Sequence, residues 1–201
     1  MTLPTVIFDL GGVLIDWNPR YLYRKLMQSE AEIEYFLSNI CTLAWNAQQD
    51  AGRSFHEATV ALQAQHPPHA AMIAAYYGRW EEMLGGPMAE SVEIFRQVKR
   101  AGLPVYALTN WSAESFIPTQ KRYAFLREFD GIVVSGEEKV AKPDARLFHI
   151  LLERYRIAAS NAVYIDDSAA NIATANSLGL HTIHFQSAEQ LRRELQEVGV
   201  I

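Results

Sequence analysis

The sequence has a single cysteine, Cys41, so no disulfide can form within the chain and a reducing environment is expected. No apolar run approaches the roughly 20 residues that a membrane-spanning helix needs. The N-terminus has no cationic region before its short apolar run, so no signal peptide is expected. The formal net charge is -5 and no basic stripe occurs, which argues against nucleic acid or an anionic membrane as a partner. We therefore expect a soluble, cytoplasmic protein.

The chain has 201 residues, of which 49% are hydrophobic and 20% are charged, an ordinary composition for a globular protein. This length is enough for a core domain with a smaller appended one. No internal repeat or low-complexity segment occurs, and no pattern indicates an oligomeric state.

Short apolar runs predict five strands, which alternate with helical patterns from residue 90 onward. The runs cover 5–8, 105–108, 131–134, 162–165 and 181–185. Apolar residues at helical spacing predict helices over 89–102, 143–155 and 168–180, the second with Pro143 at its first position. Because the strands are apolar throughout, both faces of their sheet should be covered by helices. The pattern predicts a Rossmann-like, doubly wound α/β fold with a parallel sheet.

The pattern changes between Asp16 and Gly86. This stretch shows no convincing strand and predicts helices over 19–28, 31–40, 54–65 and 70–84. The breaks fall at prolines and glycines, including Gly85-Gly86-Pro87. The simplest interpretation is an all-helical insertion into the α/β domain.

Polar side chains follow three of the predicted strands at the point where each strand ends. Asp9 follows the first strand, Thr109 and Asn110 follow the second, and Asp166 and Asp167 follow the fourth. In an open parallel sheet, ligands bind just outside the carboxyl ends of the strands. We therefore expect these side chains to converge on one crevice, although they lie far apart in the sequence.

Three carboxylates in one crevice repel one another unless a cation lies between them. A hard ion such as Mg²⁺ binds carboxylate and backbone oxygens together with substrate phosphate oxygens. Thr109 and Asn110 offer donors suited to phosphate. Lys142 lies just before a predicted helix whose N-terminus favours anions, and it supplies a fixed positive charge. The sequence thus predicts a site for Mg²⁺ and phosphate.

Four short segments carry these residues in a recognisable order. They are FDLGGVL (8–14), LTN (108–110), AKP (141–143) and YIDDS (164–168). Together they resemble the four motifs of the haloacid dehalogenase-like hydrolases, most of which are phosphatases. The resemblance covers essentially the whole chain. It implies a core over 1–15 and 89–201, with 16–88 inserted as a helical cap.

The resemblance also implies roles for the residues of the first three motifs. Asp9 resembles the nucleophile that attacks phosphorus and forms an aspartyl-phosphate. Thr109 and the backbone of Asn110 resemble the pair that holds the phosphate. Lys142 resembles the lysine that steadies both the nucleophile and the transferring phosphoryl group.

The metal ligands follow from the same resemblance. Asp166 and Asp167 resemble the acidic pair that holds Mg²⁺, with Asp167 expected to be the direct ligand. Asp9 and the backbone carbonyl of Gly11 are expected to complete the set from this chain.

Gly11 departs from the family pattern, because most family phosphatases carry a second Asp there as general acid and base. Positioned acid-base help is worth roughly 10²–10⁴ in rate. A sugar 1-phosphate needs less protonation, since its hemiacetal leaving group is more acidic than an ordinary alcohol. The FDLG opening also resembles a bacterial subgroup of these hydrolases that acts on glucose 1-phosphate-like substrates. We therefore expect a Mg²⁺-dependent phosphatase for a small phosphorylated metabolite, preferably a sugar phosphate, with water or a cap side chain as the acid.

Two other functions remain open. A 2-haloacid dehalogenase also lacks the second Asp, but it needs no metal and replaces the acidic pair with hydroxyl residues. A non-catalytic phospho-ligand-binding relative is the other alternative. A response-regulator receiver domain is excluded, since its acidic pair lies in its first strand and it has no helical insertion.

Substrate choice is expected to depend on residues near the cap. Trp111 follows the second motif and is a candidate for substrate contact. The linker residues are Asp16, Trp17, Asn18 and Arg20. The polar segment 45–54 is expected to be a loop lining the entrance, with Trp45 in the cap core. The aromatic residues Tyr76, Tyr77 and Trp80 are expected to pack helices against one another.

Asn171, four residues after Asp167, is a candidate for orienting the water ligands of the metal.

Overall fold

Strand β1 (Thr5–Phe8) lies at the centre of a parallel sheet, as its unbroken apolar run predicts. The computed structural model describes residues 4–201, and within them the sheet has the order β5-β4-β1-β6-β7. The flanking strands are β4 (Val105–Thr109), β5 (Gly131–Val134), β6 (Ala162–Asp166) and β7 (His181–His184). Each predicted strand is confirmed to within one residue at its ends. The chain builds one side of β1 and then crosses to the other, and this reversal is where such sheets bind ligands.

Helices cover both faces of the sheet, because alternate residues of each strand point to opposite sides. Val6 and Phe8 pack in one apolar cluster and Ile7 packs in another. The first cluster is covered by α6 (Ala89–Arg100), α7 (Ala113–Arg122) and α11 (Ala188–Glu197), and the second by α9 (Ala145–Arg154) and α10 (Ala169–Ser177). The short helix α8 (Ser135–Glu138) and the 3-10 turns η3 (Ala124–Glu128) and η4 (Ala159–Asn161) complete the core. The predicted doubly wound α/β fold is confirmed.

The predicted core helices end where glycine allows a left-handed turn, but one begins later than expected. Gly102 and Gly179 have φ of 78° and 83°, which ends α6 and α10. Helix α9 begins at Ala145, so the prediction that Pro143 opens it was wrong. The side chain of Asp144 caps this helix by accepting a hydrogen bond from the Arg146 N–H at 2.9 Å.

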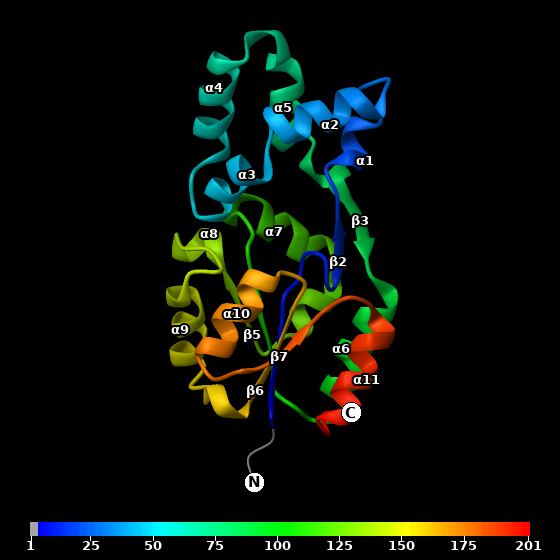
Figure 1. The fold of residues 1–201 in the computed structure, drawn as a ribbon, viewed down its shortest axis with the longest axis vertical. Coiled ribbons are helices and arrows are strands. Elements are labelled where there is room, and N and C mark those ends of the chain that lie inside the picture. Colours follow the sequence, from blue (N-terminus) through cyan, green and yellow to red (C-terminus); the bar gives the residue numbers. More distant parts are fainter. Residues whose placement is uncertain (1–3) are drawn as a thin grey trace.

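A third apolar cluster lies in the cap. Figure 1 shows the cap above the core. The cap consists of α1 (Arg20–Tyr23), α2 (Glu30–Asn39), α3 (Leu43–Asp50), α4 (Phe55–Gln65), α5 (Ala70–Gly78) and the 3-10 turns η1 (Pro67–His69) and η2 (Trp80–Met83). Trp45 is buried in its cluster, as expected, and Cys41 is buried there too. The cap has an apolar core of its own, which is a property of a separate domain.

Two expectations for the cap need correction. The segment 45–54 is not a loop throughout, because α3 runs to Asp50; Thr42 caps it, and Trp45 and Gln49 form its buried face. The helix expected over 70–84 ends at Gly78 and gives way to the turn η2.

The two connections between cap and core form an antiparallel ribbon that the sequence did not reveal. Strand β2 (Ile15–Trp17) pairs with β3 (Leu84–Pro87), although no strand was expected between Asp16 and Gly86. Strands this short, one of them containing glycine and proline, give almost no periodic signal. A side-chain carbon at Gly85 would collide with Asp16 Oδ2, so the Asp16 carboxylate would have to move. The ribbon ties the two ends of the cap together at the boundary.

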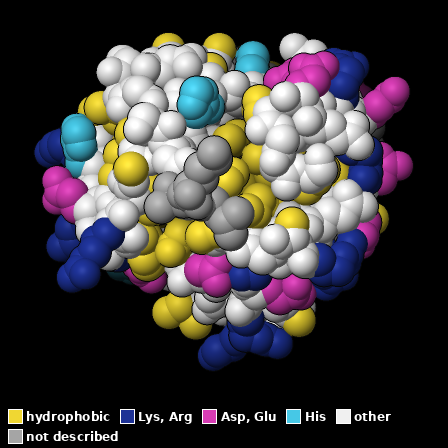
Figure 2. Space-filling view, turned by 90° about the horizontal axis from the view of Figure 1, so that it is seen from below, with side chains coloured by type: hydrophobic (Ala, Val, Ile, Leu, Met, Phe, Trp, Pro, Cys, Tyr) yellow, Lys and Arg dark blue, Asp and Glu magenta, His cyan; other side chains and the backbone are white. Residues whose placement is uncertain are grey.

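The far end of the core shows no concentration of one charge. Figure 2 views this end, away from the cap, where acidic and basic side chains mingle around hydrophobic ones. Within residues 4–201, no helix is long and apolar enough to cross a membrane.

Candidate active site

Three carboxylates meet at the carboxyl ends of the strands. Asp9 follows β1, Asp166 ends β6, and Asp167 comes directly after it. One oxygen of each lies within 4.8 Å of the others. The expected convergence of these side chains is therefore what the structure shows.

Lys142 lies between two of these carboxylates, with its side chain fully buried. Its Nζ is 3.0 Å from Asp9 Oδ1 and 2.7 Å from Asp166 Oδ2, and it donates to the Leu108 carbonyl at 2.7 Å. Burial alone would lower the pKa of Lys142, but the two carboxylates raise it above its ordinary value. The ammonium group therefore stays charged beside Asp9.

Asn110 positions Lys142. Its side-chain amide donates to the Lys142 carbonyl at 2.9 Å, and its Oδ1 accepts from the Lys142 N–H at 2.8 Å. The side-chain amide is thus engaged, which leaves the Asn110 backbone for a ligand. Thr109 Oγ1 is buried and has no hydrogen-bond partner within residues 4–201. A buried hydroxyl without a partner is unfavourable, so a ligand oxygen would satisfy it.

The pKa values of Asp9 and Asp166 are shifted in opposite directions. Burial raises the pKa of Asp9 to about 7, with Lys142 opposing the shift and Asp166 adding to it. For Asp166, burial acts in the same direction, but hydrogen bonds and the charge of Lys142 hold its pKa below the usual value. Its donors are Tyr164 OH, the Ser168 N–H at 2.8 Å and Asn171 Nδ2 at 3.0 Å. Asp166 is therefore fixed in place by protein groups.

Asp167 is the most open of the three carboxylates. Partial burial and the neighbouring Asp166 raise its pKa. A side-chain carbon at Gly12 would collide with Asp167 Oδ2, so glycine is required there, and its φ of 76° is also unfavourable for other residues. Close carboxylates, with one accessible side chain, are the donor set that a hard divalent cation requires. Asn171 bonds to Asp166, so it acts through that side chain.

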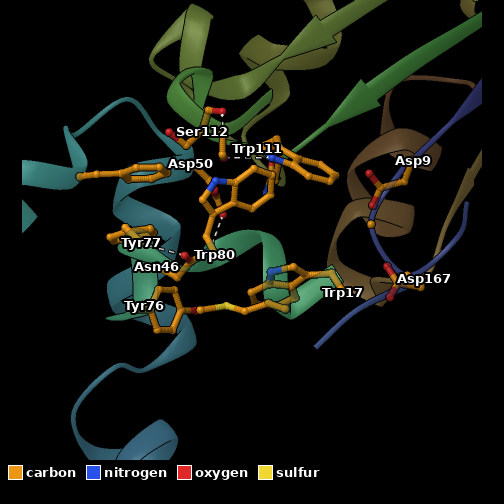
Figure 3. Close-up of a pocket in the computed structure, with 16 residues that line it drawn as sticks. Asp9, Trp17, Asn46, Asp50, Tyr76, Tyr77, Trp80, Trp111, Ser112 and Asp167 are labelled. Atoms are coloured by element: carbon orange, nitrogen blue, oxygen red, sulfur yellow. Dashed lines mark hydrogen bonds between the residues drawn. The ribbon is translucent and has the colours of Figure 1, made fainter. Parts of the chain in front are cut away.

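The carboxylates open into a cavity of about 260 Å³ between the core and the cap (Figure 3). The predicted residues that line it are Asp9, Gly11, Trp17, Asn110, Trp111 and Asp167. Thr109, Lys142 and Asp166 lie buried behind this surface. The cavity is thus continuous with the predicted catalytic residues.

Three linker residues expected to choose the substrate do not line this cavity. Asp16 accepts a hydrogen bond from Tyr21 OH, and Arg20 pairs with Glu34 at 2.5 Å on an exposed surface. Asn18 Oδ1 accepts from the Arg20 N–H at 3.0 Å. They serve local structure of the cap, whereas Trp17 reaches the cavity.

Several cavity residues were not predicted from the sequence. They are Phe55, Ser112 and Ser115, together with Tyr76, Tyr77 and Trp80, which were expected only to pack helices. Asn46 and Asp50 also line the cavity, and they belong to the segment 45–54 that was expected to line its entrance. No motif marks them, because their common position depends on how α3, α4, α5 and η2 fold over the core. Aromatic residues near the end of the cap were the one available signal.

Asp50 connects the cap to the core. Its carboxylate accepts from Asn46 Nδ2 at 3.0 Å and from the backbone N–H of Ser112, and its carbonyl accepts from Ser135 Oγ at 2.5 Å. Burial raises the pKa of Asp50 to about 7, and the Ser112 bond only partly opposes the shift. Asp50 is therefore a costly charge at the interface of the two units.

Replacing Asp50 with asparagine should change how stability depends on pH. Since the folded pKa lies above the unfolded value of 3.8, the stability that Asp50 contributes is fully present below 3.8 and is lost as pH rises through about 7. The free energy of unfolding of Asp50→Asn, relative to that of wild type, should therefore increase between about pH 5 and about pH 8. The increase is at most roughly 1.4 kcal/mol for each unit by which the folded pKa of Asp50 exceeds its unfolded pKa. Thermal unfolding at both pH values measures this. An equal difference in stability between wild type and Asp50→Asn at the two pH values would contradict a raised pKa of Asp50.

The fold and the site define a class of enzyme. The sequence model of the haloacid dehalogenase-like hydrolases matches residues 3–179, so the chain belongs to this family. The sesquiterpene phosphatase astK of Aspergillus oryzae is 26% identical, over 98% of this chain and 97% of its own length. The phosphoglycolate phosphatase of Photobacterium profundum is 26% identical, over 89% of this chain and 81% of its own length.

Solved structures show the same fold. A HAD family enzyme from Bacteroides thetaiotaomicron, bt-2542, superposes with a TM-score of 0.68 at 23% identity. The match covers 92% of this chain and 95% of that chain. That structure is a complex with magnesium and inorganic phosphate.

Proposed function

We propose that the chain is a Mg²⁺-dependent phosphomonoester hydrolase that acts on a small phosphorylated metabolite through an aspartyl-phosphate. The observation that carries the proposal is Asp9 at the cavity surface, with Lys142 Nζ 3.0 Å away and two further carboxylates beside it. This arrangement suits a carboxylate nucleophile whose target carries negative charge.

Asp9 and Asp167 would hold Mg²⁺, with the Gly11 carbonyl, while Asp166 would complete the acidic pair from its buried position. When bound, Mg²⁺ supplies the positive charge that offsets carboxylate and phosphate oxygens. In this protein, Asp166 also fixes Lys142, so the two acidic residues would have different tasks.

In the first step, a carboxylate oxygen of Asp9 forms a bond to phosphorus while the bond from phosphorus to the leaving oxygen breaks. Lys142 favours the ionised form of Asp9 by opposing the effect of burial on its pKa, and it offsets charge on the phosphoryl oxygens. Thr109 Oγ1 and the Asn110 N–H donate to those oxygens. Gly11 offers no proton, so the leaving oxygen takes one from water.

In the second step, water attacks the phosphorus of the aspartyl-phosphate. Inorganic phosphate leaves and the carboxylate of Asp9 is restored. The water loses its proton to solvent or to a released phosphate oxygen, since Gly11 provides no base. The first step should therefore be slowest when the leaving group is a strongly basic alkoxide, whereas the second step starts from the same aspartyl-phosphate for every ester.

Two observations bear on the class of substrate. The missing acid at Gly11 supports a sugar 1-phosphate, as expected from the sequence. Relatives named for a sesquiterpene and for phosphoglycolate extend the candidates to other organic phosphates. The cytoplasmic location stays a prediction.

Dehalogenation fits the site less well. One partial relative is the (S)-2-haloacid dehalogenase of Pseudomonas fluorescens, 26% identical over 46% of this chain. However, the close carboxylates of Asp9, Asp166 and Asp167 call for a cation, which a halide displacement does not need. A purely phospho-ligand-binding protein would have no need for a nucleophile beside Lys142.

The experiment is phosphate release from p-nitrophenyl phosphate and a panel of sugar phosphates, in Mg²⁺ and in EDTA. We expect release in Mg²⁺ and its loss in EDTA, with recovery when Mg²⁺ is added back. Halide release from 2-chloropropionate in EDTA, without phosphate release, would establish the dehalogenase instead. Binding of inorganic phosphate without turnover of any ester would establish the non-catalytic alternative.

A further inference from the structure

The part of the cavity remote from the carboxylates is walled by aromatic rings. Figure 3 shows Trp17, Trp80 and Trp111 between the carboxylates of Asp9 and Asp167 and the more distant tyrosines. The ring-bearing residues of the lining are Trp17, Phe55, Tyr76, Tyr77, Trp80 and Trp111. Tyr77 stacks on Phe55 with ring centroids 3.8 Å apart, and Trp80 meets Trp111 edge to face at 6.4 Å. The rings hold one another in fixed orientations.

Several polar groups of this wall bond to one another, whereas Tyr76 OH is buried without a partner within residues 4–201. Asn46 donates to Asp50 at 3.0 Å and accepts from Tyr77 OH at 3.0 Å. Ser115 Oγ accepts from Trp111 Nε1 at 3.1 Å. A sugar ring would bring several hydroxyl groups that need partners, and each unpaired one would be costly. An apolar group would leave these internal bonds intact.

The charge of the wall is of one sign. Among the lining residues within 4–201 there is no lysine, arginine or histidine, whereas Asp50 adds a carboxylate to the cap side. Lys142 lies buried behind Asp9 and is engaged there. A leaving group with a second phosphate or a carboxylate would therefore meet repulsion without a compensating cation.

We infer that the substrate is a phosphate monoester whose leaving group is a neutral, apolar alcohol with a flat or unsaturated body. This rests on the proposed function and names the substrate class of that same site. Aromatic rings contact such a body through their faces and edges. An apolar cavity of about 150 Å³ holds benzene, so about 260 Å³ accommodates one ring, a few further carbons and the phosphoryl group.

The test compares esters that differ in the body of the leaving group but not in the type of oxygen. Benzyl phosphate and glucose 6-phosphate both release a primary alcohol, so the absence of an acid at Gly11 affects both. Phosphoglycolate adds a carboxylate. We expect kcat/KM in Mg²⁺ to be highest for benzyl phosphate and lowest for phosphoglycolate, with the difference mainly in KM.

Variants of Trp80 test whether its ring causes the preference for benzyl phosphate. Trp80→Ala should lower kcat/KM for benzyl phosphate by about three- to tenfold, the effect of one aromatic pair, and should change glucose 6-phosphate little. Trp80→Phe should retain most of the preference. Tyr35→Ala is the matched control, since Tyr35 is 59% exposed on α2 and does not line the cavity. Thermal unfolding of each variant checks that it is folded.

The outcomes separate this inference from the proposed function. A higher kcat/KM for glucose 6-phosphate or phosphoglycolate would overturn the inference and leave the phosphatase in place. An equal loss on all esters in Trp80→Ala would also overturn it, because the ring would then serve structure. No Mg²⁺-dependent release from any ester, including p-nitrophenyl phosphate, would overturn the proposed function and with it the inference. Quenching of tryptophan emission by benzylphosphonate, and not by inorganic phosphate, supports the apolar subsite independently of turnover.

Discussion

Replacing Asp9 with asparagine is expected to lower kcat/KM for phosphate release by at least about 10⁴-fold, the scale on which loss of a nucleophile acts. The amide can occupy the same space but cannot form the aspartyl-phosphate. Lys142 would remain paired with Asp166 at 2.7 Å, so the site should keep its shape. Phosphate release from p-nitrophenyl phosphate in Mg²⁺ measures the loss.

The folded state of Asp9→Asn should be at least as stable as that of wild type near neutral pH. Burial raises the pKa of Asp9 to about 7, so its ionised form is unfavourable in the folded state. Urea unfolding provides the control. Activity within about tenfold of wild type, in a folded variant, would show that Asp9 is not the nucleophile.

Replacing Gly11 with aspartate is expected to raise kcat on alkyl phosphates by about 10²-fold, at the lower end of the range for positioned acid-base help. This corresponds to roughly 3 kcal/mol of barrier. A side-chain carbon at Gly11 would meet nothing within 4 Å, and Gly11 is not among the glycines with positive φ. The new side chain therefore fits without strain. It would lie at the cavity surface, two residues after Asp9.

The leaving group distinguishes this effect from a general one. Gly11→Asp should change kcat/KM for p-nitrophenyl phosphate little, because kcat/KM reports the first step and nitrophenolate leaves without a proton. Gly11→Asn is the matched control, since it has the same shape but cannot donate an acidic proton, and it should not raise the rate. Equal rates for both variants on glucose 6-phosphate and benzyl phosphate would mean that the slow step does not involve the proton.

The sequence revealed the site best where chemistry lies at strand ends. Asp9, Thr109 and Asp166 follow short apolar runs, and parallel strands bring such ends together whatever lies between them. Lys142 was identified by its place before a helix and its motif. The sequence could not show that the side chain of Asn110 forms hydrogen bonds with the backbone of Lys142, since two loops must meet for these bonds to form.

The cap was predicted less completely, for physical reasons. Its helices were largely recognised, but the contact of Asp50 with Ser112 depends on how the cap sits on the core. Tyr77 and Trp80 look like packing residues in any helical pattern, and their exposure to the cavity is a property of tertiary structure. The β2–β3 ribbon joins segments about 70 residues apart, each too short for a periodic signal.

The most direct test of the central claim is the covalent state of Asp9 during turnover. The protein is mixed with Mg²⁺ and p-nitrophenyl phosphate, quenched in acid within the first turnovers, digested and analysed by mass spectrometry. We predict one added phosphoryl group on the peptide that carries Asp9, absent in Asp9→Asn and in EDTA. Turnover by wild type with that peptide always unmodified, or with the phosphoryl group on another residue, would contradict the account.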